Sequence, residues 1–379
     1  MPNGFYKDAL DVLLKRWAAE KRIQRDPIYQ DLTLPLEEMM LAEIAYTGFV
    51  NNRLFFSGRE VVEQIRTFLA SNLNAPRHLD GDEILNAIQV QQGILVERAR
   101  NALSFSHLTL QEYLTAQHIA DHNLINQLVA NHLCNQRWRE VFLLVAGLMR
   151  GGADDLLLQM ETATQQFINT DTLKNLLRWA EQATEGSEGN FKLAAKRTAA
   201  ILAALIFSHR LSVTVVYRFD RSLNLDSIIY RNRSIAIAQR RFKEANATIH
   251  NVDPPSIRKA LQEANEARYR DKVLPFNTTL DLAYELEKAR IFNSVNFTAF
   301  LATLEGLKPA QFKQTWYDAF QLNSEWVNLS EAEANALNNY LYANELIVRC
   351  KEAAVRVSPQ VGAGIEERML TVRDEGKSV

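Results

Sequence analysis

The stretch Leu103–Ala120, LSFSHLTLQEYLTAQHIA, changes from the periodicity of a β-strand to that of an α-helix. Residues 102–105 (ALSF) have the composition of a short strand, and the apolar residues that follow recur at helical spacing. Thr109 and Glu112 have the spacing of a capping box, in which each residue satisfies a backbone N–H of the other. We therefore expect a strand that leads into a helix starting near residue 109.

His107 lies at the corner between this strand and this helix. Leu108 and Tyr113 have the spacing of a hydrophobic staple, which would fix the corner. An imidazole beside the free N–H groups and the positive end of a helix dipole is well placed to bind a phosphate. A packed, hydrogen-bonded histidine at a domain corner is the alternative, and the residues alone leave both interpretations open.

The sequence upstream of this corner has the pattern of a winged helix. It predicts a helix with Pro35 in its first turn, a second helix after a capping box of Ser57 and Glu60, and a third that ends at Gly93. Short strand-like runs follow at 94–97 and 102–105, with a turn between them. We place the winged-helix domain at residues 30–108, after a connector at 1–29 that contains an amphipathic helix.

Downstream of residue 108 the helical pattern is nearly continuous. We expect one helical domain at 109–250 and a second at 251–379, with breaks at Gly151-Gly152, 184–190 and Pro254-Pro255. The fold class is therefore all-α, mainly multi-helix, with one small β-hairpin wing. Leu211–Tyr217, which is rich in β-branched residues, fits either a strand or a buried helix.

Composition narrows the functional classes. Hydrophobic residues make up 47% of the chain and charged residues 23%, and the formal net charge is -2, so nothing in the balance indicates a nucleic-acid or membrane surface. The cysteines, Cys134 and Cys350, lie far apart and suggest neither a disulfide framework nor a metal clip. We find no signal peptide or bilayer-spanning run and expect a cytoplasmic protein.

The run Phe105–Leu114, FSHLTLQEYL, resembles the F-x-H-x-[ST]-[FL]-Q-E-[FY] signature that closes the winged helix of NACHT-family signalling NTPases of the STAND class. Residues 6–14, 138–148 and 345–354 are similar to the cyanobacterial members of that family. The resemblance implies the C-terminal part of such a protein, the winged helix and helical domains without the P-loop domain. Family members are often linked to defence or stress signalling.

The resemblance also implies a role for His107. In this family the signature histidine reaches the β-phosphate of bound ADP and holds the closed, inactive state. The parent NTPases bind ADP or ATP with Mg²⁺, whereas we expect this chain to bind no cofactor alone. The implied partners are a P-loop NACHT domain, located upstream or in a separate protein, and protein partners or a self-oligomer.

A P-loop is missing from the sequence, so we expect no enzymatic activity. The motif GxxxxGK[ST] cradles phosphates with its backbone N–H groups and its lysine. Gly376-Lys377-Ser378 matches the end of that motif, but Thr371 stands where its first glycine is required.

Two further features have an ordinary explanation beside a functional one. His118 and His122 could hold a metal together with Asp121, although a solvated helix face explains the same pattern. Residues 210–243 contain eight basic and two acidic residues, which could meet nucleic acid or an acidic partner, or form a docking face.

Two alternatives to the regulatory function stay open at this point, a winged-helix DNA-binding regulator and an α-solenoid scaffold. The best groove-entering helix, 82–92, begins with Asp82 and Glu83 and has no lysine or arginine. We therefore expect no sequence-specific DNA binding.

Overall fold

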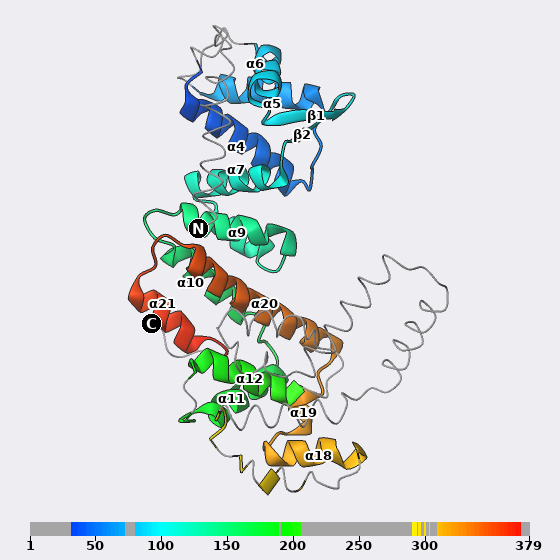
Figure 1. Ribbon diagram of the computed structural model, residues 1–379, viewed down its shortest axis with the longest axis vertical. Helices are drawn as coiled ribbons and strands as arrows, with labels where there is room; N and C mark the ends of the chain where they lie inside the picture. The colour runs from blue at the N-terminus through cyan, green and yellow to red at the C-terminus, as the bar shows by residue number, and fades with distance from the viewer. Residues whose placement is uncertain are drawn as a thin grey trace, which may run out of the picture. The chain divides into compact units, whose positions relative to one another are not determined.

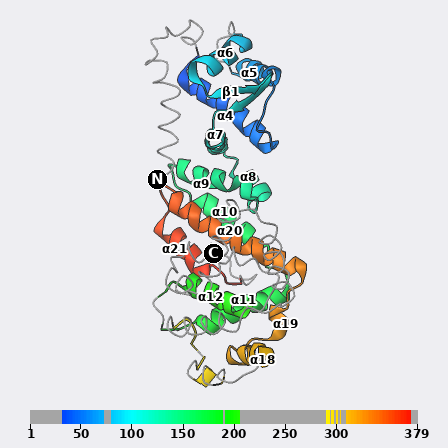
Figure 2. The ribbon, with the colours of Figure 1, turned by 45° about the vertical axis from the view of Figure 1, so that its right-hand side comes forward.

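The computed structural model describes residues 32–72, 80–188, 191–205, 290–293, 295, 296, 299, 300, 303 and 309–372. It divides into two compact units. Unit 1 comprises Met1–Met160 with Arg349–Pro359, and unit 2 comprises Glu161–Val348 with Gln360–Val379. The described segments are helices with a single two-stranded sheet among them (Figures 1 and 2), which confirms the predicted fold class. Residues 6–24 and 210–243, with their expected helix, strand-like run and basic stretch, lie outside the described residues.

The described part of unit 1 begins with the helices of the winged helix, α4 (Leu34–Val50), α5 (Gly58–Ser71) and α6 (Gly81–Ala87). Pro35 lies in the first turn of α4, as predicted. The Ser57–Glu60 capping box is present in full, with both bonds at 3.2 Å. Met40 and Ile44 of α4 are buried, whereas Met39 is 40% exposed, and Glu37 is fully buried.

The third helix and the wing lie close to where the sequence predicts them. After α6 the helix continues as a π-helical segment (Ile88–Gln92), and Gly93 ends it with a left-handed φ of 63°. Strands β1 (Leu95–Ala99) and β2 (Ala102–Phe105) then form an antiparallel hairpin. The extended backbone at Phe56 adds to the far edge of β2 through two hydrogen bonds to Leu103, both 2.8 Å long. The wing is thereby tied to the segment that precedes α5.

Helix α7 (Leu108–Asp121) packs against α4 on one side and α9 (Arg139–Leu148) on another. Between α7 and α9 the chain forms α8 (Ile125–His132) and the 3-10 turn η3 (Gln136–Trp138). The core of this region is fully buried around Phe49, Trp138 and Phe142. The Phe49 and Trp138 rings meet edge to face at 4.8 Å.

Unit 2 is built on the packed pair α11 (Asp171–Thr184) and α12 (Leu193–Leu205). Alanines 199, 200, 203 and 204 of α12 are buried. The remaining described helices are α10 (Asp154–Gln165), α18 (Pro309–Ala319), α19 (Ser324–Val327), α20 (Glu331–Ala353) and α21 (Pro359–Arg368). Helices α10 and α20 contribute residues to both units. None of the helices in the described ranges is long and apolar enough to cross a membrane.

Candidate functional site

His107 is exposed at the junction of β2 and α7. It is the N-cap residue of α7 with extended backbone, φ -135° and ψ 143°, and its carbonyl oxygen accepts hydrogen bonds from Leu110 N and Gln111 N at 3.1 and 3.4 Å. Within the described ranges its imidazole accepts no cap hydrogen bond from the helix. The ring is therefore available to a ligand that approaches the first turn of α7.

Arg98 brings a second cation to this corner. Its Nη2 atom donates to the carbonyl oxygen of Ser106 at 2.9 Å, and its Nε atom donates to Ser104 Oγ at 3.1 Å. These bonds hold the exposed guanidinium at Ser106, the residue that precedes His107. An exposed imidazole, a fixed guanidinium and the first N–H groups of a helix, which have no intrahelical acceptor, form a surface that favours an anion.

Helix α7 begins close to the predicted residue 109, but the predicted capping box is wrong. The helix begins at Leu108 with His107 as its cap, so Thr109 lies inside the first turn and Glu112 makes no capping box with it. Leu108 is the first residue of the helix and 51% exposed, so it does not hold the position before the cap that the predicted staple with Tyr113 requires. The physical reason is that Ser106 N still bonds to Ile94 O across the hairpin, at 2.8 Å, so only one residue separates sheet from helix.

Gln111 and Glu112 of the same motif point into the protein instead. Gln111 is 1% exposed, and its Nε2 atom donates to the carbonyl oxygens of Arg53 (3.2 Å) and Ala45 (3.5 Å). Glu112 is 8% exposed. Burial, together with the charge of Glu140, raises the pKa of Glu112 to about 7, against an opposing effect of Arg137. Gln111 thereby joins α7 to its neighbours, whereas His107, Leu108 and Thr109 of the motif are exposed.

His118 and His122 do not form the metal site that was weighed as one interpretation of their spacing. Their rings are stacked 4.1 Å apart, and His118 stacks on Tyr46 at 4.4 Å. Burial lowers the pKa of His118 to about 4, so the ring is neutral at ordinary pH. Among the described residues no group of histidines, cysteines and carboxylates could hold a metal ion.

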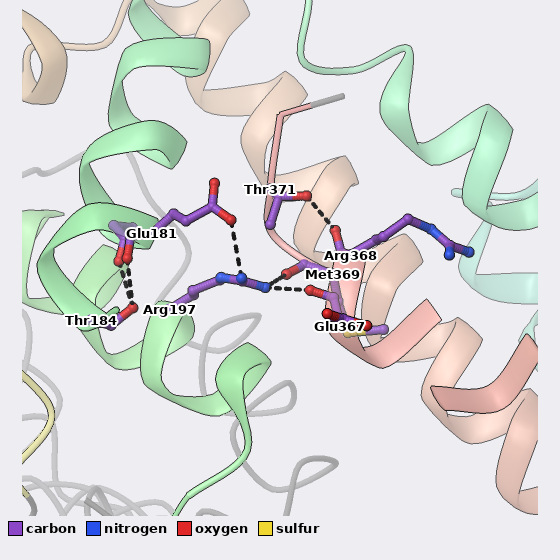
Figure 3. Close-up of polar contacts among 8 residues, drawn as sticks. Glu181, Thr184, Arg197, Glu367, Arg368, Met369 and Thr371 are labelled. Atoms are coloured by element: carbon purple, nitrogen blue, oxygen red, sulfur yellow. Dashed lines mark hydrogen bonds and ion pairs between the residues drawn. The ribbon is translucent and has the colours of Figure 1, made fainter. Parts of the chain in front are cut away.

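Unit 2 contains a polar cluster that sequence reasoning missed (Figure 3). The Arg197 guanidinium of α12 donates to the carbonyl oxygens of Glu367 and Met369 at 2.6 and 3.0 Å, and to Glu181 Oε1 at 3.1 Å. The partners of Arg197 at the end of α21 lie about 170 positions away in the sequence, so no spacing or motif could have indicated the cluster.

Two family models match the chain. Residues 3–119, which include His107, match the winged helix-turn-helix domain C-terminal to NACHT. Residues 283–372, which include α18 to α21, match the NACHT C-terminal helical domain 2. No curated protein and no solved structure matches the chain.

Proposed function

We propose that this chain, which carries the winged helix and the second helical domain of the C-terminal part of NACHT proteins, holds a NACHT NTPase in its ADP-bound closed state. The chain is a NACHT-associated regulatory region, and the proposal gives that region a mechanism. The chain supplies no turnover of its own, and the nucleotide and Mg²⁺ belong to the P-loop domain of the parent protein.

The position of His107 carries the proposal. Its imidazole is exposed at the cap of α7, beside the guanidinium of Arg98, while Gln111 and Glu112 of the same motif are buried. The exposed histidine of the motif therefore lies where a phosphate is favoured. Exposure also means that the ligand has to come from outside unit 1, as the nucleotide of a docked P-loop domain would.

A contact of this kind selects one conformational state. In the proposed closed state the winged helix is docked on the nucleotide domain, and His107 donates a hydrogen bond to the β-phosphate of ADP. In the open state the bond is absent. A ligand shifts a two-state equilibrium only by its differential affinity for the two states. A hydrogen bond to a charged group contributes about 1.5–3 kcal/mol, so the closed population changes by about tenfold or more.

The partners follow from the same proposal. The principal partner is a P-loop NACHT domain, located upstream in the same protein or in a separate one, and a self-oligomer or other proteins would receive the signal in the cytoplasm. DNA is not proposed as a ligand. The first turn of α6 presents Asp82 and Glu83, and Asp82 is paired with Arg66 at 2.8 Å. Carboxylates at this place would face the phosphates of a DNA groove.

The test is the rate at which ADP leaves the NACHT protein that contains this chain, followed with a fluorescent ADP analogue. We expect His107→Ala to release ADP about tenfold faster and to raise basal signalling, because the lost hydrogen bond stabilises only the closed state. The matched control is Arg100→Ala, which removes a cation from the exposed turn of the same hairpin and should leave the rate within about twofold.

Thermal unfolding of the same variants separates a sensor from a structural residue. His107 is exposed and its side chain makes no cap bond in the described ranges, so His107→Ala should change the melting temperature little. An unchanged ADP release rate together with a large loss of stability would show that His107 is a structural corner residue.

A further inference from the structure

Charged side chains make several hydrogen bonds at the end of α21 in unit 2. Arg197 donates to the carbonyl oxygens of Glu367 and Met369, which belong to the last turn of α21 and the residue after it. Arg368 donates to both carboxylate oxygens of Glu161, at 3.0 and 2.9 Å. Figure 3 shows the Arg197 side chain reaching from α12 to the end of α21, and the Arg368 side chain leaving α21 on the side away from Arg197. These bonds are concentrated at one end of a ten-residue helix.

The arginine at position 197 is buried, and its bonds satisfy groups that a helix leaves open. Its side chain is 7% exposed, and Glu181 supplies the compensating charge. The last carbonyl groups of a helix have no intrahelical donor. Thr371 satisfies the carbonyl of Arg368 through its hydroxyl at 2.7 Å, and Arg197 satisfies those on either side. The guanidinium thus completes the cap of α21.

The apolar contribution to the docking of α21 is small. Between Gln360 and Val372 the buried residues are Gly362, Ile365, Met369 and Leu370. By contrast, α20 is buried continuously from Tyr340 to Val348. Segments with few buried apolar side chains open locally at a lower free energy than the core to which they are attached.

We propose that residues 360–372 are a latch that opens and closes on the α11–α12 pair as a local unit, and that the Arg197 guanidinium is its lock. This device is independent of nucleotide sensing at His107, because it lies within unit 2 and requires no ligand. When the latch opens, Arg197 and Glu181 become more exposed to solvent. The sites that Met369 and Leu370 fill are exposed at the same time. The helical domain therefore has a closed and an open form.

The lock requires arginine specifically. One guanidinium serves two carbonyl oxygens through Nη1 and a carboxylate through Nη2, which a planar fork of donors allows. A lysine at the same place keeps the charge and the pairing with Glu181 but not the fork. Arg197→Lys therefore weakens the latch while leaving no uncompensated carboxylate in the protein.

The test is hydrogen–deuterium exchange of the whole chain, followed by mass spectrometry of peptides from 360–372 and from α11. We expect Arg197→Lys to raise the exchange rate of 360–372 about tenfold or more, and that of α11 by less than about twofold. The control is Arg178→Lys, an exposed arginine of α11 that donates to Asn175 at 3.3 Å, which should change neither peptide.

The unmodified protein provides a second measurement, which decides the matter even if the variant folds poorly. In low urea the amides of 360–372 should exchange through a local opening. The free energy of that opening should depend less on urea concentration than the free energy of the opening that exposes α11, because the local opening exposes less protein surface. The latch proposal would be wrong if both peptides exchanged through the same opening, or if Arg197→Lys raised the exchange rates of both peptides equally. Arg197 would then be an ordinary part of the core.

Discussion

Glu161 and Arg368 lie 207 positions apart in the sequence and form an ion pair with two hydrogen bonds, from Arg368 Nε at 3.0 Å and from Nη2 at 2.9 Å. The glutamate is 5% exposed, whereas the arginine side chain is 33% exposed. The pair therefore fixes the end of α21 to a buried carboxylate of α10, and its geometry is that of the strong fork-to-fork type.

Glu161→Gln should destabilise the protein by about 1.5–3 kcal/mol, because a neutral amide cannot accept both bonds from the arginine. The measurement is urea unfolding at neutral pH. Glu366→Gln is the control, since Glu366 pairs with Lys192, whose side chain is 59% exposed, and such a pair contributes less than about 1 kcal/mol. Equal losses for the two variants would contradict the strength assigned to the buried pair.

Glu112→Gln should stabilise unit 1 at pH 8 more than at pH 5. The pKa of Glu112 is about 7 in the folded protein, raised by burial and by Glu140 from an ordinary value of 4.5. Between pH 4.5 and pH 7 the folded state binds more protons than the unfolded state. The free energy of unfolding of the unmodified protein therefore falls, relative to that of the variant, as the pH rises through this window. The difference should be on the order of 1–3 kcal/mol by pH 8. It is measured by urea unfolding of both proteins at each pH, and a difference independent of pH would refute the raised pKa.

Gly48→Ala should destabilise the winged helix by about 1–3 kcal/mol or more. A Cβ at this position would overlap the Phe56 ring at Cε1 and Cζ and lie 3.1 Å from Gln111 Nε2. Gly58→Ala is the matched control, because its Cβ would meet its nearest neighbour, Leu85 Cδ2, at 4.0 Å at the start of α5. Thermal unfolding of the two variants should show a lower melting temperature for the first and no loss for the second, where alanine favours the helix. A tolerated alanine at 48 would mean that Phe56 can move aside.

Local signals in the sequence predicted most of the winged helix. The Ser57–Glu60 capping box and the left-handed Gly93 depend on residues within a few positions of one another, so their spacing specifies the structure. Thr109 and Glu112 have the same spacing without forming a capping box. The hairpin register fixes where β2 ends, and burial beside Glu140 and Arg137 takes the Glu112 side chain away from the helix end.

The site was predicted in part. His107 could be found because it belongs to a motif, and the structure places it at the predicted corner between strand and helix, where it is exposed. Arg98 could not, because its hydrogen bonds to Ser104 and Ser106 depend on the pairing of the two strands. The contacts of Arg197 join residues about 170 positions apart, and such contacts follow from tertiary packing alone.

Unit 1 is not encoded in one continuous stretch, since Arg349–Pro359 belongs to it. Ala153 N donates to Arg356 O at 3.0 Å, and Ser358 N donates to Asp154 Oδ1 at 2.9 Å. A truncation just before position 349 would therefore deprive Ala153 and Asp154 of these partners, so the loss of residues that follow unit 2 in the sequence would destabilise unit 1.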